Sequence, residues 1–302
     1  MGAHDAVVAA GLTKDYGAGR GVFDLDLVVP RGEVFGFLGP NGAGKTTTIR
    51  LLMGSIRPTR GGAQIFGLDC QDQAVAVKRH VGFLPGELPQ FGGLRGSEIV
   101  GYIAGLRGDV DDAHVTALAT RLGLDLGRRY REYSRGNKQK LGLVLAFMHR
   151  PALLILDEPT GGLDPLNQQT FYDLVREARG GGATVFLSSH VLSEVEHICD
   201  RIGIVRDGRL VYSGHLGNVH ALRGRRVELV FQGQAPEAAL RAAAGVSQLA
   251  IEGNRAQCAV IGTFDGLLAA LATSGAQVIS LTSEEPSLEE LFLTYFHSED
   301  RR

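Results

Sequence analysis

The sequence predicts an α/β fold, in which helices cover a sheet on both faces, followed by a smaller α+β domain. The chain has 302 residues, which is enough for about two domains. From residue 7 to about residue 217, short β-branched or aromatic runs alternate with helical segments. After residue 222 the order of elements changes. We therefore expect one domain at residues 1–221 and a second at residues 222–302.

The composition narrows the class of protein. Hydrophobic residues make up 44% of the chain and charged residues 21%, so a packed core is expected rather than disorder. A formal net charge of −2 does not favour broad binding to nucleic acid. The best apolar run, residues 141–148, is far shorter than the roughly 20 residues of a membrane helix, and the N-terminus lacks the pattern of a secretory signal. We expect a cytoplasmic protein.

The three cysteines, Cys70, Cys199 and Cys258, lie far apart with no paired spacing. This pattern indicates buried or incidental thiols in a reducing compartment, not a disulfide or metal framework.

The first domain is expected to contain buried strands joined by helices. In chain order we expect a strand at 33–39, a helix at 46–56, strands at 81–86, 153–157 and 183–190, and a hairpin at 203–214. The uniformly apolar strands suit a sheet covered on both faces. The hairpin turns at Asp207-Gly208. About 45 residues after residue 86 show helical periodicity and few strand signals, so we expect an inserted helical subdomain at about 87–135.

The second domain is expected to follow a βαββαβ order, which is typical of a ferredoxin-like fold. The segments are a strand at 225–231, a helix at 236–244, strands at 247–253 and 256–262, a helix at 263–275 and a strand at 277–283. A last helix at 286–296 opens with a capping box made by Ser287 and Glu290. No catalytic constellation appears here, so a packing or dimer-supporting module is favoured over an effector-binding domain.

The stretch GPNGAGKTTTIR, residues 39–50, contains a phosphate-binding loop. It fits the pattern G-x-x-x-x-G-K-[ST] between a predicted strand and a predicted helix. Glycines let the backbone curl so that N–H groups point at phosphate oxygens, and Lys45 would bridge the β- and γ-phosphates. The sequence therefore predicts a P-loop NTPase. The predicted nucleotide-binding residues here are Gly39, Pro40, Asn41, Gly42, Ala43, Gly44, Lys45 and Thr46.

Acidic residues follow a second buried strand. Thr46 would offer its hydroxyl to Mg²⁺, and Asp157 would hold the same ion. Glu158 would polarise an attacking water. His190 ends another strand, where it is suited to contact the γ-phosphate, although a lone histidine there is more often structural. Tyr16 precedes the P-loop and is suited to stack on adenine, the alternative being a half-exposed loop tyrosine.

A second candidate phosphate site lies in YSRGNKQKLGL, residues 133–143. Ser134 and Gly136 stand just ahead of an apolar, helix-like run, and the start of an exposed helix offers unpaired N–H groups to an anion. Asp164 and Pro165 are likewise a good N-cap and first helical residue for the next helix.

The four motifs, in the order P-loop, YSRGNKQ, LLILDEPTGGLDP and SSH, resemble the ATP-binding subunit of ABC transporters over roughly residues 7–217. The resemblance implies an ABC-type ATPase domain whose two copies enclose two ATP molecules with Mg²⁺. Ser134 and Gly136 would then bind the γ-phosphate of the other subunit's ATP. By the same resemblance, Thr47 would contact phosphate, Asp164 would signal across the dimer interface, and Lys45, Glu158 and His190 would be catalytic.

The resemblance also implies partners. They are a second copy of the chain or a paralogous ATPase subunit, and a separate transmembrane permease that docks near residues 86–106. The chain would be cytoplasmic and peripheral on the inner face of the membrane, with no nucleic acid bound. The LPGE stretch at residues 84–87, the short C-terminal module and its ending PSLEELFLTYF are most similar to those of bacterial drug- and antibiotic-export subunits. The alternatives are a soluble ABC ATPase that acts on ribosomes or DNA, and a small-molecule P-loop kinase.

The chain departs from the family pattern at three places. Arg135 and Asn137 flank Gly136 in the signature loop, where the family has two glycines and a glutamine. Gly161 stands where the family often has serine or asparagine. The Q-loop glutamine that usually follows a strand such as 81–85 is replaced by a glycine, so Glu87, Gln90 or a water molecule would take its place.

Overall fold

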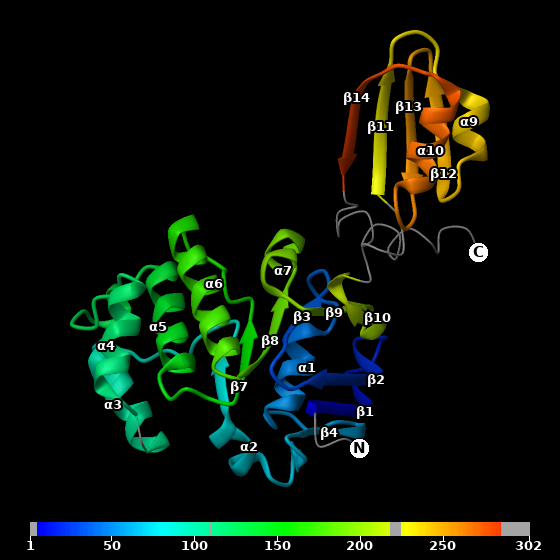
Figure 1. The fold of residues 1–302 in the computed structure, drawn as a ribbon. Helices are drawn as coiled ribbons and strands as arrows, with labels where there is room; N and C mark the ends of the chain where they lie inside the picture. The colour runs from blue at the N-terminus through cyan, green and yellow to red at the C-terminus, as the bar shows by residue number, and fades with distance from the viewer. Residues whose placement is uncertain (1–4, 109, 218–224, 285–302) are drawn as a thin grey trace. The chain divides into compact units, whose positions relative to one another are not determined.

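The structure is a computed structural model that describes residues 5–108, 110–217 and 225–284 (Figure 1). The chain divides into two compact units, Met1–Ser213 and Gly214–Arg302. The expected domain boundary at 221/222 and the expected helix at 286–296 lie outside the described residues.

A six-stranded sheet forms the centre of the first unit. Its order is β10-β9-β3-β8-β7-β6, and the pairs β9–β3, β3–β8, β8–β7 and β7–β6 are parallel. The strands are β3 (Val34–Leu38), β6 (Val81–Leu84), β7 (Leu153–Asp157), β8 (Thr184–Ser189), β9 (Arg201–Arg206) and β10 (Arg209–His215). Every residue of β3, β7 and β8 is buried, as uniformly apolar strands covered on both faces require. The strands expected from the sequence are confirmed.

A second, antiparallel sheet was not expected from the sequence. Its order is β2-β1-β4-β5, and its strands are β1 (Asp5–Asp15), β2 (Gly21–Pro30), β4 (Arg60–Ile65) and β5 (Leu68–Asp69). Burial alternates along β2, as it does in a sheet with one face toward a core. Leu25, Leu27 and Val29 of β2 join Phe35, Phe37 and the rest of the main apolar cluster, so the two sheets share one core.

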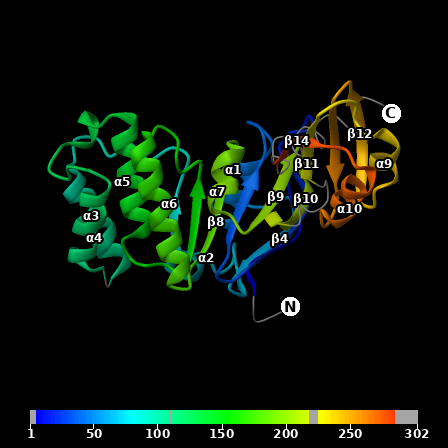
Figure 2. The ribbon, with the colours of Figure 1, turned by 45° about the horizontal axis from the view of Figure 1, so that its top comes forward.

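Helices occupy the segment expected to be helical between residues 87 and 135. They are α3 (Gly96–Arg107), α4 (Asp112–Arg121), the short 3₁₀ helix Tyr130–Glu132 and the start of α5 (Arg135–Phe147). The Asp111 side chain caps α4 by accepting the Ala113 N–H at 2.9 Å. Figures 1 and 2 both place α3, α4 and α5 together at one end of this unit, away from β4.

The remaining helices of the first unit connect the strands. They are α1 (Lys45–Leu52), α2 (Ala74–His80), α6 (Pro165–Gly180) and α7 (Leu192–Ile198). The helix expected at 46–56 is α1, which is shorter because Gly54 takes a left-handed φ of 61° directly after the helix.

The second unit has its own four-stranded antiparallel sheet, in the order β12-β13-β11-β14. Its elements are β11 (Arg225–Phe231), α9 (Glu237–Ala242), β12 (Val246–Glu252), β13 (Arg255–Val260), α10 (Asp265–Ser274) and β14 (Val278–Glu284). Leu240 of α9 and Leu267 of α10 pack in one cluster with Leu229 and Phe231 of β11. The two helices therefore cover the same face of the sheet.

Within the described residues, no helix is long and apolar enough to cross a membrane. Cys70, Cys199 and Cys258 are all buried and unpaired, as the sequence indicated.

Candidate nucleotide-binding site

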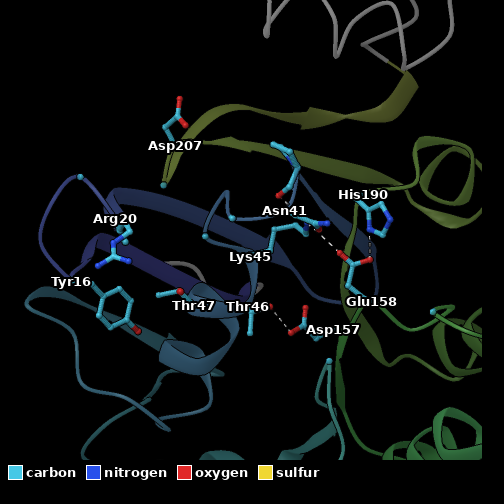
Figure 3. A pocket seen from close by; sticks show the side chains of 18 of the residues that line it. Tyr16, Arg20, Asn41, Lys45, Thr46, Thr47, Asp157, Glu158, His190 and Asp207 are labelled. Carbon is cyan, nitrogen blue, oxygen red and sulfur yellow. Dashed lines mark hydrogen bonds and ion pairs between the residues drawn. The ribbon is translucent and has the colours of Figure 1, made fainter. Parts of the chain in front are cut away.

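A cavity of about 650 Å³ opens in the first unit beside the start of α1 (Figure 3). It is formed by segments far apart in the chain: the loop after β1, the P-loop, the ends of β7 and β8, and the turn between β9 and β10. Its lining residues are Tyr16, Gly19, Arg20, Gly21, Pro40, Asn41, Gly42, Gly44, Lys45, Thr46, Thr47, Gly86, Arg135, Asp157, Glu158, Gly161, His190, Asp207 and Gly208. The cavity thus brings together most of the predicted nucleotide residues.

The P-loop runs from β3 into α1 and needs glycine where it comes close to other backbone. A Cβ atom on Gly39 would lie 2.5 Å from the Val205 carbonyl oxygen, which no side chain tolerates. Gly44, the residue before α1, has a φ of 105°, a conformation that glycine adopts at no steric cost. Gly39 and Ala43 do not line the cavity, and Ala43 is buried. Gly39 and Ala43 therefore shape the backbone of the loop and do not line the cavity.

Lys45 lies at the base of the cavity and is 5% exposed. Its Nζ donates to the carbonyl oxygens of Gly39 at 2.6 Å and Pro40 at 3.2 Å. It also lies 3.2 Å from Glu158 Oε1. The ammonium group is therefore held by the loop itself, beside Glu158.

Asp157 is buried at the end of β7 and is bonded on both carboxylate oxygens. Thr46 Oγ1 donates to Oδ2 at 2.8 Å, and Ser188 Oγ donates to Oδ1 at 2.5 Å. The pair of a threonine hydroxyl and a carboxylate supplies the hard oxygen ligands that Mg²⁺ prefers when the rest of its shell comes from phosphate and water. In the part of the chain that the structure describes, no group of three or more His, Cys, Asp or Glu is arranged to hold a metal ion, so these residues fit such a shared ion rather than an all-protein cage.

Glu158 follows β7 in a strained conformation. Its φ is 50°, which is uncommon for a residue other than glycine, and its N–H is held by both the carbonyl and the hydroxyl of Ser188. Gln139 of α5 donates to the Glu158 carbonyl oxygen at 3.2 Å. The backbone is therefore fixed from two sides, and it aims the carboxylate into the cavity.

His190 completes a line of polar contacts across the cavity. Its Nδ1 lies 2.7 Å from Glu158 Oε2, while the other carboxylate oxygen faces Lys45 (Figure 3). His190 stands directly after β8, next to the end of β7 in the parallel sheet. Because the carboxyl ends of parallel strands meet at one edge of a sheet, the two residues meet there although 32 positions separate them.

Tyr16 and Arg20 lie together at one side of the cavity, and Asp207 lies above the P-loop (Figure 3). The Tyr16 ring is half-exposed, and Lys14 Nζ lies 5.5 Å from its centroid. The turn between β9 and β10 is bound to the P-loop, because Gly208 N–H donates to the Ala43 carbonyl oxygen at 3.1 Å. A flat, half-exposed ring at a cavity mouth is suited to stacking on a nucleobase.

Ser134, Gly136 and Asp164 do not line this cavity. Ser134 caps α5 by accepting the Asn137 N–H at 3.2 Å, and Asp164 caps α6 by accepting the Asn167 N–H at 2.9 Å. This backbone hydrogen bond and a second one from the Asn167 side chain lower the pKa of Asp164. The three residues therefore stand at exposed helix starts outside their own chain's cavity.

The structure places the two side chains offered in place of the missing Q-loop glutamine; Glu87 lines both of the smaller cavities described next, and Gln90 lines one of them. Gly86 lines the main cavity, and a Cβ on it would lie 3.1 Å from Asp157 Oδ2. Glu87 lines a neighbouring cavity of about 400 Å³ together with Thr46 and Asp157. Gln90 lines a different cavity of about 470 Å³, with Glu158. Glu87 is thus the residue that shares a cavity with the candidate metal pair.

Sequence reasoning missed several residues of the site. Ser188 was visible only as part of the SSH motif, and Asp207 only as a hairpin turn. Arg20 has no sequence signal, because a lone arginine in a glycine-rich loop is ordinary. Arg135 was noted as a departure from the family pattern, and its side chain reaches the cavity by lying along Gly162, where a Cβ would be 3.3 Å from Arg135 Cγ.

Comparison with known proteins gives one consistent answer. Residues 22–161 match the family model described as ABC transporter. The daunorubicin resistance ATP-binding protein DrrA3 of Streptomyces coeruleorubidus is 33% identical, over 99% of this chain and 98% of that protein. The bacitracin transport ATP-binding protein BcrA of Enterococcus faecalis is 39% identical, over 69% of each chain.

Solved structures agree with the sequence relatives. An ATP-binding subunit of an ABC transporter superposes with a TM-score of 0.66 at 31% identity, covering 71% of this chain and 92% of that one. The dimeric, post-hydrolysis structure of the ATP-binding cassette MJ0796 with ADP and Pi gives a TM-score of 0.62 at 21% identity, covering 70% and 98%. At 21% identity, the similarity to MJ0796 is a similarity of fold alone.

Proposed function

This chain belongs to the ABC transporter family and carries its ABC-type ATPase domain, and from that premise we propose that it binds ATP with Mg²⁺, hydrolyses it and drives a separate membrane-spanning partner. One observation carries the proposal. The cavity holds an unbroken line of contacts from Lys45 through Glu158 to His190, beside the Thr46–Asp157 pair. Those are the groups needed to hold a triphosphate and activate a water against it.

The proposed mechanism follows from these contacts. Lys45 would exchange its Glu158 contact for the β- and γ-phosphates, since a phosphate is the stronger partner for the ammonium group. Glu158, released from Lys45, would accept a hydrogen bond from the attacking water and draw off its proton. His190 would keep the Glu158 carboxylate aimed at that water. Mg²⁺, held by the Thr46 hydroxyl and the Asp157 carboxylate, would neutralise the charge that develops on the phosphate oxygens.

Glu87 is our candidate for the role of the Q-loop glutamine. Gly86 contributes no side chain, and Glu87 lines the cavity that Thr46 and Asp157 share. Its carboxylate would bind water on the metal side of the site. Gln90 and a water molecule alone are the alternatives.

We propose that the working form is a dimer with two ATP molecules at the interface. Ser134, Gly136 and Asp164 lie at helix starts outside their own chain's cavity, which supports a role toward a neighbour's nucleotide. The partner would be a second copy of the chain or a paralogous ATPase subunit. The dimeric MJ0796 cassette shares the fold and supports this arrangement.

The transported substrate is proposed to be a drug-like or other hydrophobic compound, because relatives of this chain are named for daunorubicin resistance and bacitracin transport. A separate permease would span the membrane, and this chain would bind its cytoplasmic side near residues 86–106. Residues 222–302 are proposed to form a ferredoxin-like accessory domain. The βαββαβ order and antiparallel strand order of residues 225–284 support that class.

The variant Glu158→Gln tests the chemistry. It keeps the shape of the side chain but removes its ability to take a proton, so it should bind Mg-ATP and hydrolyse it about a hundredfold or more slowly. It should also accumulate as an ATP-bound dimer, measured by size-exclusion chromatography. Hydrolysis at the rate of the unaltered chain would remove Glu158 from the proposed role.

The same variant tests the partner. Tagged Glu158→Gln loaded with Mg-ATP should capture one polytopic membrane protein, in stoichiometric amount, from detergent-solubilised membranes of its own cells. Lys45→Ala provides the matched control, since it should capture none. Recovery of ribosomes or DNA-bound proteins would keep the ATP chemistry and replace the transport function.

A further inference from the structure

Glu194 is a buried carboxyl that the proposed chemistry does not use. It lies in α7, four residues after His190, and only 3% of the residue is exposed. Its Oε2 accepts a hydrogen bond from Ser189 Oγ at 2.5 Å. Its Oε1 is fully enclosed and, among the described residues, has no partner at hydrogen-bond geometry. A buried carboxyl in this state costs stability, so its presence needs a reason.

The contact between Glu194 and Ser189 holds the turn that carries His190, one member of the proposed catalytic pair of Glu158 and His190. Ser189 Oγ, bound to Glu194, also accepts the Val191 N–H at 3.0 Å. Ser189 and Val191 are the residues on either side of His190. Through Ser189, the Glu194 carboxyl is therefore connected to both residues that flank His190 in the short segment between β8 and α7.

Glu194 also faces the other turn. The Thr160 side chain adjoins the Glu194 carboxyl and lowers its pKa, although no hydrogen bond of standard geometry joins it to Oε1. Thr160 lies two residues after Glu158, in a turn closed by the Gly161 N–H to the Glu158 carbonyl oxygen at 3.2 Å. One side chain thus adjoins both the segment that holds His190 and the segment that holds Glu158.

We propose that Glu194 is a positioning residue that joins these two turns and thereby maintains the contact between His190 Nδ1 and Glu158 Oε2. It touches neither water nor nucleotide in this scheme. Its effect on hydrolysis passes through Ser189 and Thr160 to the separation and aim of the catalytic pair, where displacements of about 1 Å are expected to cost up to about a hundredfold in rate.

The neutral carboxylic acid is the form that suits this role. Burial raises the pKa of Glu194, the Ser189 and Thr160 hydroxyls oppose that rise, and the charge of Glu158 adds to it. An ionised Glu194 would repel the Glu158 carboxylate, which lies in the other of the two turns. The titratable groups that face Glu194 are Glu158 after β7, His190 before α7, Tyr172 on α6 and Cys199 at the end of α7.

The inference rests on the proposed ATP hydrolysis and deepens it, and two substitutions test it. Glu194→Gln keeps the size, neutrality and hydrogen bonds of the acid, so kcat should stay within about threefold of the unaltered chain. Glu194→Ala removes the acceptor of the Ser189 hydroxyl and the side chain beside Thr160, so kcat should fall about tenfold or more while the Kd for Mg-ATP changes by less than about twofold. Ser193→Ala, an exposed position of the same helix, is the control and should change neither.

The pH dependence gives a readout that a merely structural role would not move. As pH rises and Glu194 ionises, kcat of the unaltered chain should decline, and Glu194→Gln should lack that decline. Because the folded pKa is raised, ionisation destabilises the fold as pH rises. The melting temperature of Glu194→Gln should therefore rise relative to that of the unaltered chain as pH increases through the ionisation of Glu194.

If Glu194→Ala does not fold, Ser189→Ala removes the link without altering α7. It should lower kcat alone, and adding Glu194→Gln should lower it no further, since both changes break one connection. Full kcat in Glu194→Ala or Ser189→Ala, with the decline of kcat at rising pH unchanged in Glu194→Gln, would overturn the inference. An unaltered chain that binds ATP but never hydrolyses it would instead overturn the proposed function.

Discussion

Lys45 is held in position before any phosphate reaches it. The carbonyl oxygens of Gly39 and Pro40 fix its ammonium group inside the loop, so ordering the side chain adds little to the entropy cost of binding. Glu158 supplies a temporary counter-charge. The P-loop lysine and the candidate base are thereby linked, and binding of a nucleotide at one frees the other.

Replacing Lys45 with alanine should remove most of the affinity for ATP. A charge-assisted bond to phosphate contributes about 1.5–3 kcal/mol, so the Kd should rise about tenfold to a hundredfold. Fluorescence titration with a labelled ATP analogue measures it. Lys78→Ala, at an exposed position of α2, should leave the Kd unchanged. Equal affinities in both variants would contradict the assignment of the phosphate loop.

Protonation of the partly buried His149 ring should make the free energy of unfolding depend on pH. Burial and the nearby charge of Arg107 lower its pKa from 6.5 to about 4, against a weaker opposite effect of the Val81 carbonyl. The unfolded chain therefore takes up the proton first, and the free energy of unfolding should fall as pH drops from about 6.5 to about 4. For a partly buried ring the loss should be about 1–2 kcal/mol.

Urea unfolding at pH 7 and pH 4.5 checks this expectation. His149→Gln should lose less stability between the two values than the unaltered chain does. His215→Gln, an exposed position on β10, should behave as the unaltered chain. A pH dependence that is the same with and without His149 would show that other groups cause it.

At the scale of elements, the start of α5 is packed directly onto the turn that precedes α6. A Cβ on Gly136 would lie 2.7 Å from the Gly162 carbonyl oxygen, so only glycine fits there. The two helix starts capped by Ser134 and Asp164 are thus held next to one another. The relative position of these two helix starts therefore depends on the absence of a side chain at Gly136.

Gly136→Ala should separate these helix starts. We expect a loss of about 1–3 kcal/mol in stability and a weaker ATP-dependent dimer, measured by thermal melting and by chromatography of the variant in a Glu158→Gln background. Gly101→Ala in α3 is the matched control. A Cβ there meets nothing within 4 Å, so the change should stabilise by about 0.5–1 kcal/mol. A stabilised Gly136→Ala would contradict the packing argument.

The elements also show what sequence reasoning can and cannot reach. The P-loop, the buried strands β3, β7 and β8, and the caps at Ser134 and Asp164 are local, because residue type and short spacing determine them. The sheet β2-β1-β4-β5 was missed, because its half-buried strands carry a weak signal and β4 pairs with β1 from a distant part of the chain. Arg20 and Asp207 escaped notice for the same reason, since the fold brings them to the cavity from distant segments.

At the scale of the whole molecule, each unit has its own apolar cluster and the nucleotide cavity is lined entirely by residues of the first unit. A ligand that binds a folded unit stabilises that unit by mass action. Nucleotide binding should therefore raise the stability of the first unit and leave the stability of the second unit unchanged.

Calorimetry of Glu158→Gln with and without Mg-ATP checks this expectation. At a hundred times the Kd, ATP should stabilise the first unit by about 2.7 kcal/mol and raise one melting transition. The transition of the second unit should stay where it was. Equal shifts of both transitions would show that the units melt as one.

The left-handed backbone of Glu158 has a consequence for laboratory evolution. Its φ of 50° is a strain that glycine would relieve, by about 1 kcal/mol. A selection for heat resistance alone should therefore enrich Glu158→Gly, a substitution that deletes the candidate base. Thermostable descendants of this chain would have to be screened for turnover at every round, because a substitution that relieves strain at this position also removes the group on which the proposed reaction depends.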